Sequence, residues 1–178
     1  CATDGNHGRA VAWGSLPFWC NCEIYIHRNV SVGREEAIAK YGAQVIRIKG
    51  NYDDSVRLAA EVADKNDYTV VSDTSYEGYT DIPKDVMQGY TVMVDESLKQ
   101  LDEMPTHVFL QGGVGGFPAA VVSFIVESLE SPPIFVIVEP TNADCLFQSA
   151  VNEKPTVIHG ELDTIMAGLA CGEVSLLA

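Results

Sequence analysis

A glycine-rich stretch at residues 111–116, with the sequence QGGVGG, constrains the fold of this chain more than any other feature. The apolar residues 108–110 before it predict a short buried strand, and the apolar run 117–126 after it predicts a helix with Pro118 in its first turn. Glycines permit positive φ and a close approach to the backbone. The unpaired amides of the first helical turn then favour an anion such as a phosphate. The same pattern is also typical of a tight turn that binds nothing, and both interpretations stay open at this point.

Short apolar runs and amphipathic stretches alternate along the chain. We expect strands at residues 23–27, 44–49, 68–71, 108–110 and 134–138. We expect helices at residues 9–13, 31–41, 53–64, 83–101, 117–126 and 142–150. The alternation predicts an α/β fold of three layers, with mainly parallel sheets and helices on both faces. A change of composition near residues 96–106 predicts two lobes, at residues 1–96 and 97–178.

The composition excludes some classes of partner. Of the 178 residues 47% are hydrophobic, which argues against disorder, and the formal net charge of −14 argues against nucleic acid or an anionic membrane as a partner. No apolar run is long enough to span a bilayer, and no basic segment followed by an apolar one opens the chain, so we expect a cytoplasmic protein. The five cysteines lack a repeated C-x-x-C spacing, so we expect no metal site and mostly reduced thiols.

The N-terminal residues bring several reactive groups close together. Asp4, Asn6 and His7 lie beside two glycines, just before the helix expected at residues 9–13. Small and polar residues in such a place are typical of a capped helix N-terminus. An acid, an amide and an imidazole within four residues also suit a functional site, and the pattern alone leaves both interpretations open.

A second polar segment follows the strand expected at residues 68–71. Ligands of parallel sheets bind beyond the carboxyl ends of the strands, and Asp73 lies just past this end. The segment 72–79 is polar and aromatic, without the period of a helix or a strand. It is therefore either a solvated loop or an active-site loop.

Several motifs follow one another along the whole chain. They are TDGNHGR at 3–9, DT and EGY within 73–79, PTHVFLQG at 105–112, VEP and ADCL within 138–146, and IMAGLACGE at 165–173. Together they resemble the diaminopropionate ammonia-lyase family, and the resemblance is weakest at residues 14–32. The resemblance implies a pyridoxal-phosphate-dependent lyase with the fold of tryptophan synthase β, known as fold type II. It also implies the conversion of D- and L-2,3-diaminopropionate to pyruvate and ammonia.

The resemblance assigns roles to the residues singled out above. Asn6 would bind the phenolic oxygen of the cofactor ring, and Asp4 and Asp73 would be the two catalytic acids. Two acids suit an enzyme that removes a proton from either face of the α-carbon. The residues that would hold the cofactor phosphate are Gly112, Gly113, Val114, Gly115 and Gly116. The resemblance further implies an amino acid as substrate and a homodimer as the whole enzyme.

One residue that the resemblance implies is absent from this sequence. Enzymes of this fold type hold the cofactor on a lysine that precedes the GN motif, whereas all six lysines here follow Asn6. We therefore expect an internal piece of the enzyme, which ends before the part of the large lobe that contacts the pyridine nitrogen. Alone it should bind the cofactor weakly, through its phosphate only, form no covalent adduct with it and lack lyase activity.

Two other functions stay open, together with one hypothesis about thiols. A threonine or serine dehydratase would share most motifs, although it would not need an acid on each face. A non-catalytic α/β module that binds a phosphorylated ligand would need only the glycine loop. Cys145 and Cys171 lie inside the motifs, and we expect their sulfurs either to pair or to remain two buried reduced thiols.

Overall fold

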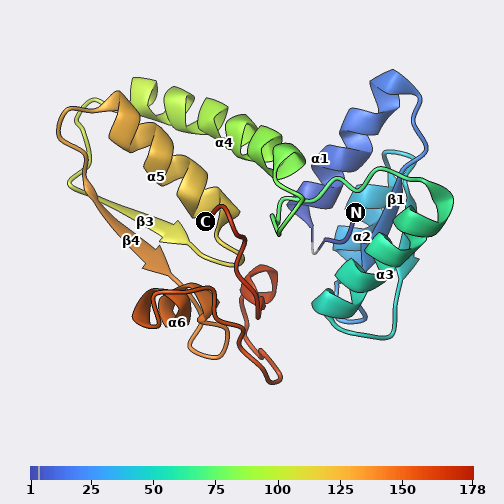
Figure 1. Cartoon of the computed structure of the whole chain (residues 1–178). Helices are drawn as coiled ribbons and strands as arrows, with labels where there is room; N and C mark the ends of the chain where they lie inside the picture. The colour runs from blue at the N-terminus through green and yellow to red at the C-terminus, as the bar shows by residue number, and fades with distance from the viewer. Residues whose placement is uncertain (4) are drawn as a thin grey trace. The chain divides into compact units, whose positions relative to one another are not determined.

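The computed structural model describes residues 1–3 and 5–178, which form two compact units. The first unit is Cys1–Ser72 and the second unit is Asp73–Ala178. The first unit contains, in order, α1 (Asn6–Ser15), η1 (Leu16–Phe18), β1 (Glu23–Ile26), α2 (Val32–Ala39), β2 (Gln44–Arg47) and α3 (Tyr52–Asn66) (Figure 1). The second unit contains α4 (Asp81–Gln100), β3 (His107–Gln111), α5 (Gly116–Ser128), β4 (Ile134–Val138), α6 (Cys145–Val151) and η2 (Ala167–Leu169).

The first unit is built around β1. Strands β1 and β2 are parallel, with Glu23 opposite Gln44. On the other side of β1, the amide of Tyr25 donates to the carbonyl of Cys1 at 2.8 Å, and the amide of Thr3 donates to the carbonyl of Tyr25 at 3.1 Å. Residues 1–3 therefore run parallel to β1, and the predicted parallel pairing is confirmed.

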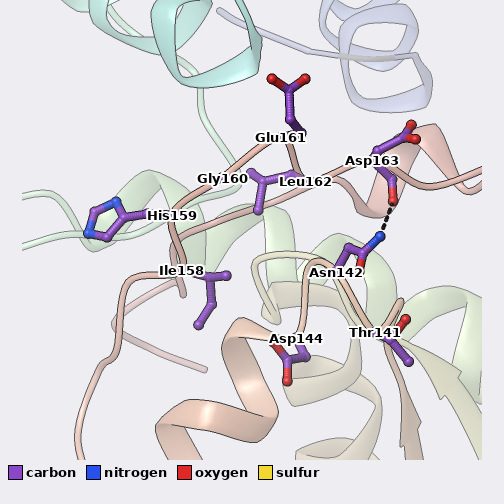
Figure 2. A pocket seen from close by; sticks show the side chains of 9 residues that line it. All are labelled: Thr141, Asn142, Asp144, Ile158, His159, Gly160, Glu161, Leu162 and Asp163. Atoms are coloured by element: carbon purple, nitrogen blue, oxygen red, sulfur yellow. Dashed lines mark hydrogen bonds between the residues drawn. The ribbon is translucent and has the colours of Figure 1, made fainter.

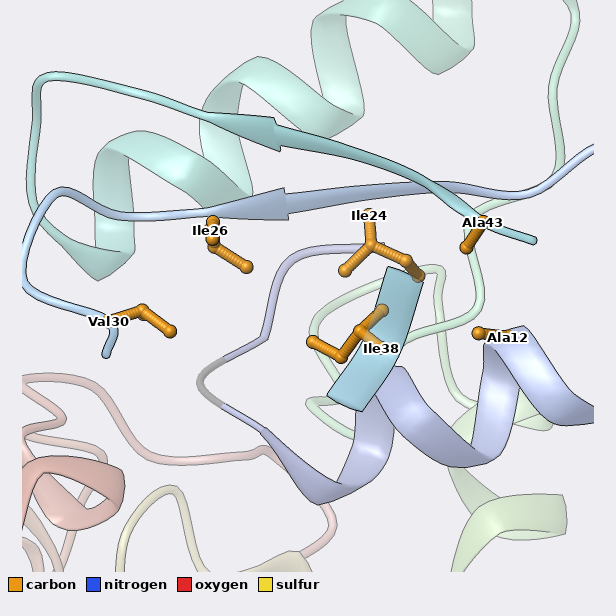
Figure 3. Packing of buried hydrophobic residues seen from close by; sticks show 6 residues of the cluster. All are labelled: Ala12, Ile24, Ile26, Val30, Ile38 and Ala43. Carbon is orange, nitrogen blue, oxygen red and sulfur yellow. The ribbon is translucent and has the colours of Figure 1, made fainter. Parts of the chain in front are cut away.

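Side chains of β1 pack on both faces of this sheet. Ile24 and Ile26 are fully buried and face α1 and α2, where they contact Ala12 and Ile38 (Figure 3). Tyr25 points to the opposite face and packs with α3. Because successive side chains of a strand alternate between faces, burial on both sides needs a layer of helices on each. The first unit therefore has the three layers that the sequence predicts.

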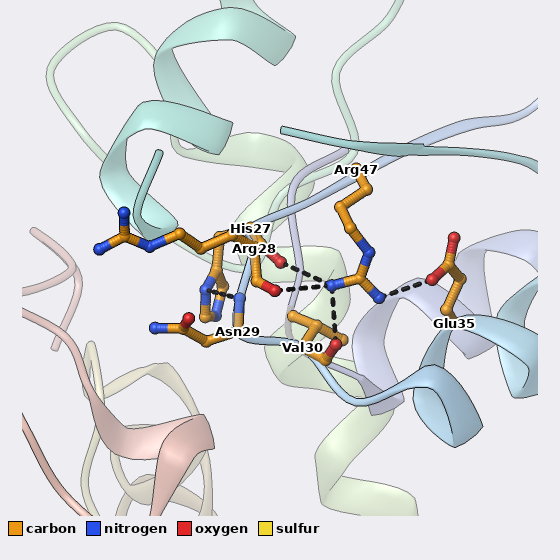
Figure 4. Close-up of polar contacts among 6 residues, drawn as sticks. All are labelled: His27, Arg28, Asn29, Val30, Glu35 and Arg47. Atoms are coloured by element: carbon orange, nitrogen blue, oxygen red, sulfur yellow. Dashed lines mark hydrogen bonds and ion pairs between the residues drawn. The ribbon is translucent and has the colours of Figure 1, made fainter. Parts of the chain in front are cut away.

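An arginine holds the turn that leaves β1. The Nη1 of Arg47 donates to the carbonyl oxygens of His27, Arg28 and Val30, at 3.3, 2.9 and 2.8 Å (Figure 4). Its Nη2 forms an ion pair with Glu35 on α2. One planar guanidinium thus satisfies three carbonyls at the carboxyl end of β1, where the backbone has left the ladder.

The second unit places the glycine stretch at the carboxyl end of β3. Strands β3 and β4 are parallel, with Gln111 opposite Val138. The core of this unit joins α4, β3 and α5 through Val94, Leu110, Val121 and Ile125. Leu110 on β3 is buried, whereas its neighbours Phe109 and Gln111 are exposed. This alternation fixes the register of β3, and with it the point where the glycines begin.

The structure differs from the sequence prediction in two places. Residues 68–71 form no strand, and they lie outside the two sheets of the described residues. The apolar and β-branched composition of this segment indicates a strand only where a neighbouring strand offers a ladder. Helix α6 begins at Cys145 rather than at residue 142. The division into lobes at residues 1–96 and 97–178 stays a prediction; residues 96–97 lie inside α4, and the two compact units of the structure meet after Ser72.

Residues 1–3 and 5–178 contain neither a membrane-spanning helix nor a cluster of metal ligands. None of the helices in this part of the chain is both long and apolar enough to cross a membrane. No group of histidine, cysteine, aspartate and glutamate side chains in it is arranged to hold a metal ion.

Candidate functional site

The glycine stretch turns the chain from β3 into α5. The amide of Gly112 still donates to the carbonyl of Val138 at 2.9 Å, so the β3–β4 ladder extends one residue beyond the strands. Gly115 then adopts a left-handed conformation, with φ of +97°, and caps α5. Helix α5 starts at the next residue. The predicted sequence of strand, glycine loop and helix is confirmed.

The carbonyls and the amides of this loop differ in their hydrogen bonding. The carbonyl oxygens of Gly113 and Val114 accept from the Cys145 thiol at 3.5 Å and from the Ser175 amide at 2.7 Å. The carbonyl of Gly115 accepts from Ala119 inside α5, at 3.0 Å. By contrast, none of the amides of residues 113–117 donates a hydrogen bond to another described group. The loop therefore offers a run of free N–H donors at the positive end of a 13-residue helix, which suits an anion.

The glycines are also required by the packing behind the loop. A Cβ atom on Gly112 would lie 2.7 Å from a methyl group of Leu146, and one on Gly115 would lie 2.6 Å from Ala178 and 2.7 Å from Leu146. A Cβ on Gly113 would lie 3.3 Å from the sulfur of Cys171. The tight packing thus explains why residues 112, 113 and 115 carry no side chain, and the free amides support the anion interpretation independently.

Helix α6 lies behind the loop and is anchored by a carboxylate. Glu139 follows β4, and its carboxylate accepts from the amides of Leu146 and Phe147 at 2.9 and 2.8 Å. Burial raises the pKa of Glu139. Burial, together with the nearby charge of Glu139, raises the pKa of Cys145 to about 11, so this thiol stays protonated and can donate to the loop.

Cys145 and Cys171 both border Gly113, as the contacts above show. All five cysteines are thiols in the part of the chain that the structure describes. No disulfide therefore joins the sulfurs of Cys145 and Cys171 in this part of the chain, where Cys145 is buried and Cys171 is half-buried.

Asp73 lies beside the start of α5. Its carbonyl oxygen would be 3.2 Å from a Cβ placed on Gly116, so the two backbones touch. Its half-buried carboxylate accepts from the hydroxyl of Thr74 at 3.4 Å. Burial, and then the negative charge of Asp73, raise the pKa of Tyr90, whose ring meets Phe117 edge-on at 5.4 Å. The structure therefore brings together Asp73 and the glycine loop, which the sequence analysis singled out separately.

Asn6 lies in the first unit, at the start of α1. It is exposed, and the helix end that presents it is capped by Thr3, whose hydroxyl oxygen accepts from the amides of Gly5 and Gly8, both at 3.1 Å. The Nε2 of His7 lies 2.9 Å from the carbonyl oxygen of Val71 and donates to it, since a carbonyl can only accept. Asp4, the other predicted acid, lies outside the described residues.

A pair of buried serines beside the loop is not predicted by the sequence. Ser75 and Ser175 are each 2% exposed, and their hydroxyl oxygens lie 2.7 Å apart. Ser75 stands in the polar segment that the sequence analysis read as a loop. A serine in a tail segment such as Ser175 gives no signal of its own, because nothing in the sequence links two positions 100 residues apart.

A shallow cavity of about 330 Å³ lies elsewhere in the second unit. Figure 2 shows its lining, in which the side-chain amide of Asn142 donates to the carbonyl of Asp163 at 3.0 Å. The residues that line it are Thr141, Asn142, Asp144, Ile158, His159, Gly160, Glu161, Leu162 and Asp163. None of the predicted site residues is among them.

Comparisons with known proteins converge on one family. The family model described as pyridoxal-phosphate dependent enzyme matches residues 1–178. The diaminopropionate ammonia-lyase of Escherichia coli strain K12 is 44% identical over 175 residues, which cover 96% of this chain and 44% of that protein. The crystal structure of the holo form of that lyase from Escherichia coli superposes with a TM-score of 0.91 at 42% identity, over 99% of this chain and 45% of the other.

A more distant relative has a different name. The probable D-serine dehydratase of Carboxydothermus hydrogenoformans is 25% identical over 189 residues, which cover 97% of this chain and 43% of that protein. The chain thus spans a little less than half the length of these relatives. The matches confirm the fold type that the sequence resemblance implies.

Proposed function

Because the chain belongs to the family of pyridoxal-phosphate-dependent enzymes, we propose that the whole protein is a lyase that converts 2,3-diaminopropionate to pyruvate and ammonia. The identity of 44% to a relative of that name supports this choice over a dehydratase, since the dehydratase relative is 25% identical. A D- or L-amino acid is the substrate, and the proposal includes a cytoplasmic homodimer.

The observation that carries the proposal is the row of free amides at residues 113–117. A phosphate group needs several donors within a short reach, and here they come from consecutive backbone N–H groups at one helix end. In a chain of net charge −14 the attraction has to be local, since the overall field repels anions. The residues present fit the phosphate of the cofactor, and the resemblance assigns the ring oxygen to Asn6.

The remaining residues would move protons. Bound pyridoxal phosphate would withdraw the electrons released when the α-carbon loses its proton. Asp73 would accept that proton from one face of the substrate, and Asp4 would accept it from the other face when the opposite enantiomer is bound. The contact between the carbonyl of Asp73 and Gly116 supports this role, because a general base must lie within reach of the proton that it accepts.

We further propose that no lysine of this chain holds the cofactor. An amine that reacts with an aldehyde at neutral pH must lose its proton, which requires a desolvated site. All the lysines here are exposed instead; they are Lys40, Lys49, Lys65, Lys84, Lys99 and Lys154. Borohydride reduction of the purified chain with pyridoxal phosphate, followed by peptide mapping, should give no stoichiometric label at any of them. A single fully labelled lysine would contradict the proposal.

Kinetics on separate enantiomers test the function. In the whole protein, Asp73→Asn and Asp4→Asn should each lower turnover of a different enantiomer by about 10²–10⁴, the usual effect of a general base. Asp81→Asn is the matched control, because that carboxylate is exposed on the first turn of α4. Equal losses on both enantiomers from each variant would contradict the two-acid mechanism, and faster turnover of D-serine or L-threonine would favour a dehydratase.

A further inference from the structure

Three segments of the second unit meet at the buried pair Ser75 and Ser175. The amide of Ser75 donates to the hydroxyl of Ser175 at 2.9 Å, and the amide of Leu177 donates to the hydroxyl of Ser75 at 2.8 Å. The amide of Leu176 donates to the carbonyl of Ser75, also at 2.9 Å. The peptide of Ser75 is therefore held on its N–H, its carbonyl and its side chain by one stretch of chain.

The same stretch is tied to the glycine loop. The amide of Ser175 donates to the carbonyl of Val114 at 2.7 Å, inside the row of free amides. Ser75 is thus connected to the middle of the loop through a single residue. Both hydroxyls are almost completely shielded from water, so no solvent molecule can replace either bond without opening the structure.

Asp73 stands only two residues before this anchor. Its carbonyl touches Gly116, so the segment is fixed against α5 at one end and against Ser175 at the other. Few backbone torsions remain between Ser75 and the carboxylate of Asp73. A general base works only within hydrogen-bond reach of the proton it accepts.

We infer that Ser75 and Ser175 are positioning residues, which hold the carboxylate of Asp73 in register with the glycine loop. The inference rests on the role proposed above for Asp73. The hydroxyl pair acts through Asp73 and touches neither substrate nor cofactor. Removing either hydroxyl leaves the loop sequence and the carboxylate intact, but takes away part of the anchor of the segment that connects them.

The test compares Ser75→Ala in two backgrounds of the whole protein. In the otherwise unchanged enzyme it should lower kcat about 10- to 100-fold with little change in KM, because a displacement of about 1 Å costs that much. In the Asp73→Asn background it should cause no further loss, because residues that act as a unit are not additive. Ser175→Ala should behave in the same way, and the double serine variant should lose no more than either single one.

Ser97→Ala is the matched control. Its hydroxyl is exposed on α4 and donates only to Met93, one turn earlier in the same helix, so kcat should not change. Hydrogen exchange gives a readout without turnover: in Ser175→Ala the amide of Ser75 should exchange faster, while the amides of α5 keep their protection. Unchanged exchange at Ser75 would show that the pair does not hold the segment.

The outcomes separate this inference from the proposed function. An equal loss of kcat in both backgrounds, or no loss in the unchanged enzyme, overturns the positioning role while the role of Asp73 stands. A wild-type rate in Asp73→Asn itself overturns the role of Asp73, whatever the serine variants do.

Discussion

Two helices of this chain, α1 and α5, begin beside glycines and satisfy their first amides in opposite ways. At α1 the buried hydroxyl of Thr3 takes the amides of Gly5 and Gly8. At α5 no side chain of residues 1–3 and 5–178 accepts from the amides of residues 113–117, and neighbouring groups donate to the loop carbonyls instead. The first terminus can therefore present side chains such as Asn6 to a ligand, whereas the second presents backbone donors. Glycine content alone does not distinguish the two, and the capping side chain does.

The largest effect should come from adding a side chain at the N-terminus of α5, where the glycine loop presents its backbone amides. We expect Gly115→Ala to lower the free energy of unfolding by about 2–4 kcal/mol, because φ is +97° and the new methyl group would overlap Ala178 and Leu146. Gly89→Ala is the control, since the space around that helical glycine is open, and it should stabilise the protein by about 0.5–1 kcal/mol. Urea unfolding measures both, and equal effects would contradict the argument.

A smaller effect should follow from removing the hydroxyl of Thr3, which caps the N-terminus of α1. Thr3→Val keeps the shape of the side chain but leaves the amides of Gly5 and Gly8 without their acceptor, which should cost about 1–3 kcal/mol. In Thr91→Val the lost hydroxyl bonds only within α4, and the change should stay within about 0.5 kcal/mol. A Thr3→Val variant as stable as the wild type would mean that water caps α1 equally well.

Inorganic phosphate should distinguish the two termini directly. At about ten times its dissociation constant, phosphate should stabilise the chain by roughly 1.4 kcal/mol, measured as a shift of the urea midpoint against chloride at equal ionic strength. Thr3→Val should keep this shift and Gly115→Ala should lose it. Phosphate also stabilises proteins through general salt effects, so a shift that survives in Gly115→Ala would count against a site at the loop.

The last prediction concerns the Cys145 thiol, which lies behind the glycine loop and acts only at high pH. Because burial raises the pKa of Cys145 to about 11, the unfolded chain loses this proton first, near the ordinary value of 9.0. The folded state binds more protons between these two values, so stability should fall as pH rises from 9 to 11 and should be unaffected by this group below 9. Cys145→Ser should flatten that part of the profile. At pH 8, iodoacetamide should modify exposed Cys20 at least about tenfold faster than Cys145.

The sequence predicts what depends on local pattern and misses what depends on distant partners. The strand–glycine–helix order at residues 107–128 follows from apolar runs and Pro118, and the structure has it. The strand expected at 68–71 was wrong, because propensity cannot supply a ladder partner. The polar cluster at residues 4–7 predicts a capped N-terminus of α1 without indicating the capping residue, which is Thr3. The sequence does not reveal the contacts between Ser75, Ser175 and the loop, because they join residues about 60 to 100 positions apart.

The contact between Ser75 and Ser175 also affects the order in which parts of the chain fold. Chain segments that lie far apart in sequence must close a long loop before they meet, which is slow and entropically costly. The glycine turn at residues 112–116, where we propose that the anion binds, can form its local shape early, from β3 and α5, during synthesis on the ribosome. The segment of Asp73 cannot be fastened to it until residues 175–177 have emerged. The proposed phosphate site would therefore form first. The proposed base, Asp73, would reach its final position only later, when residues 175–177 have been synthesised.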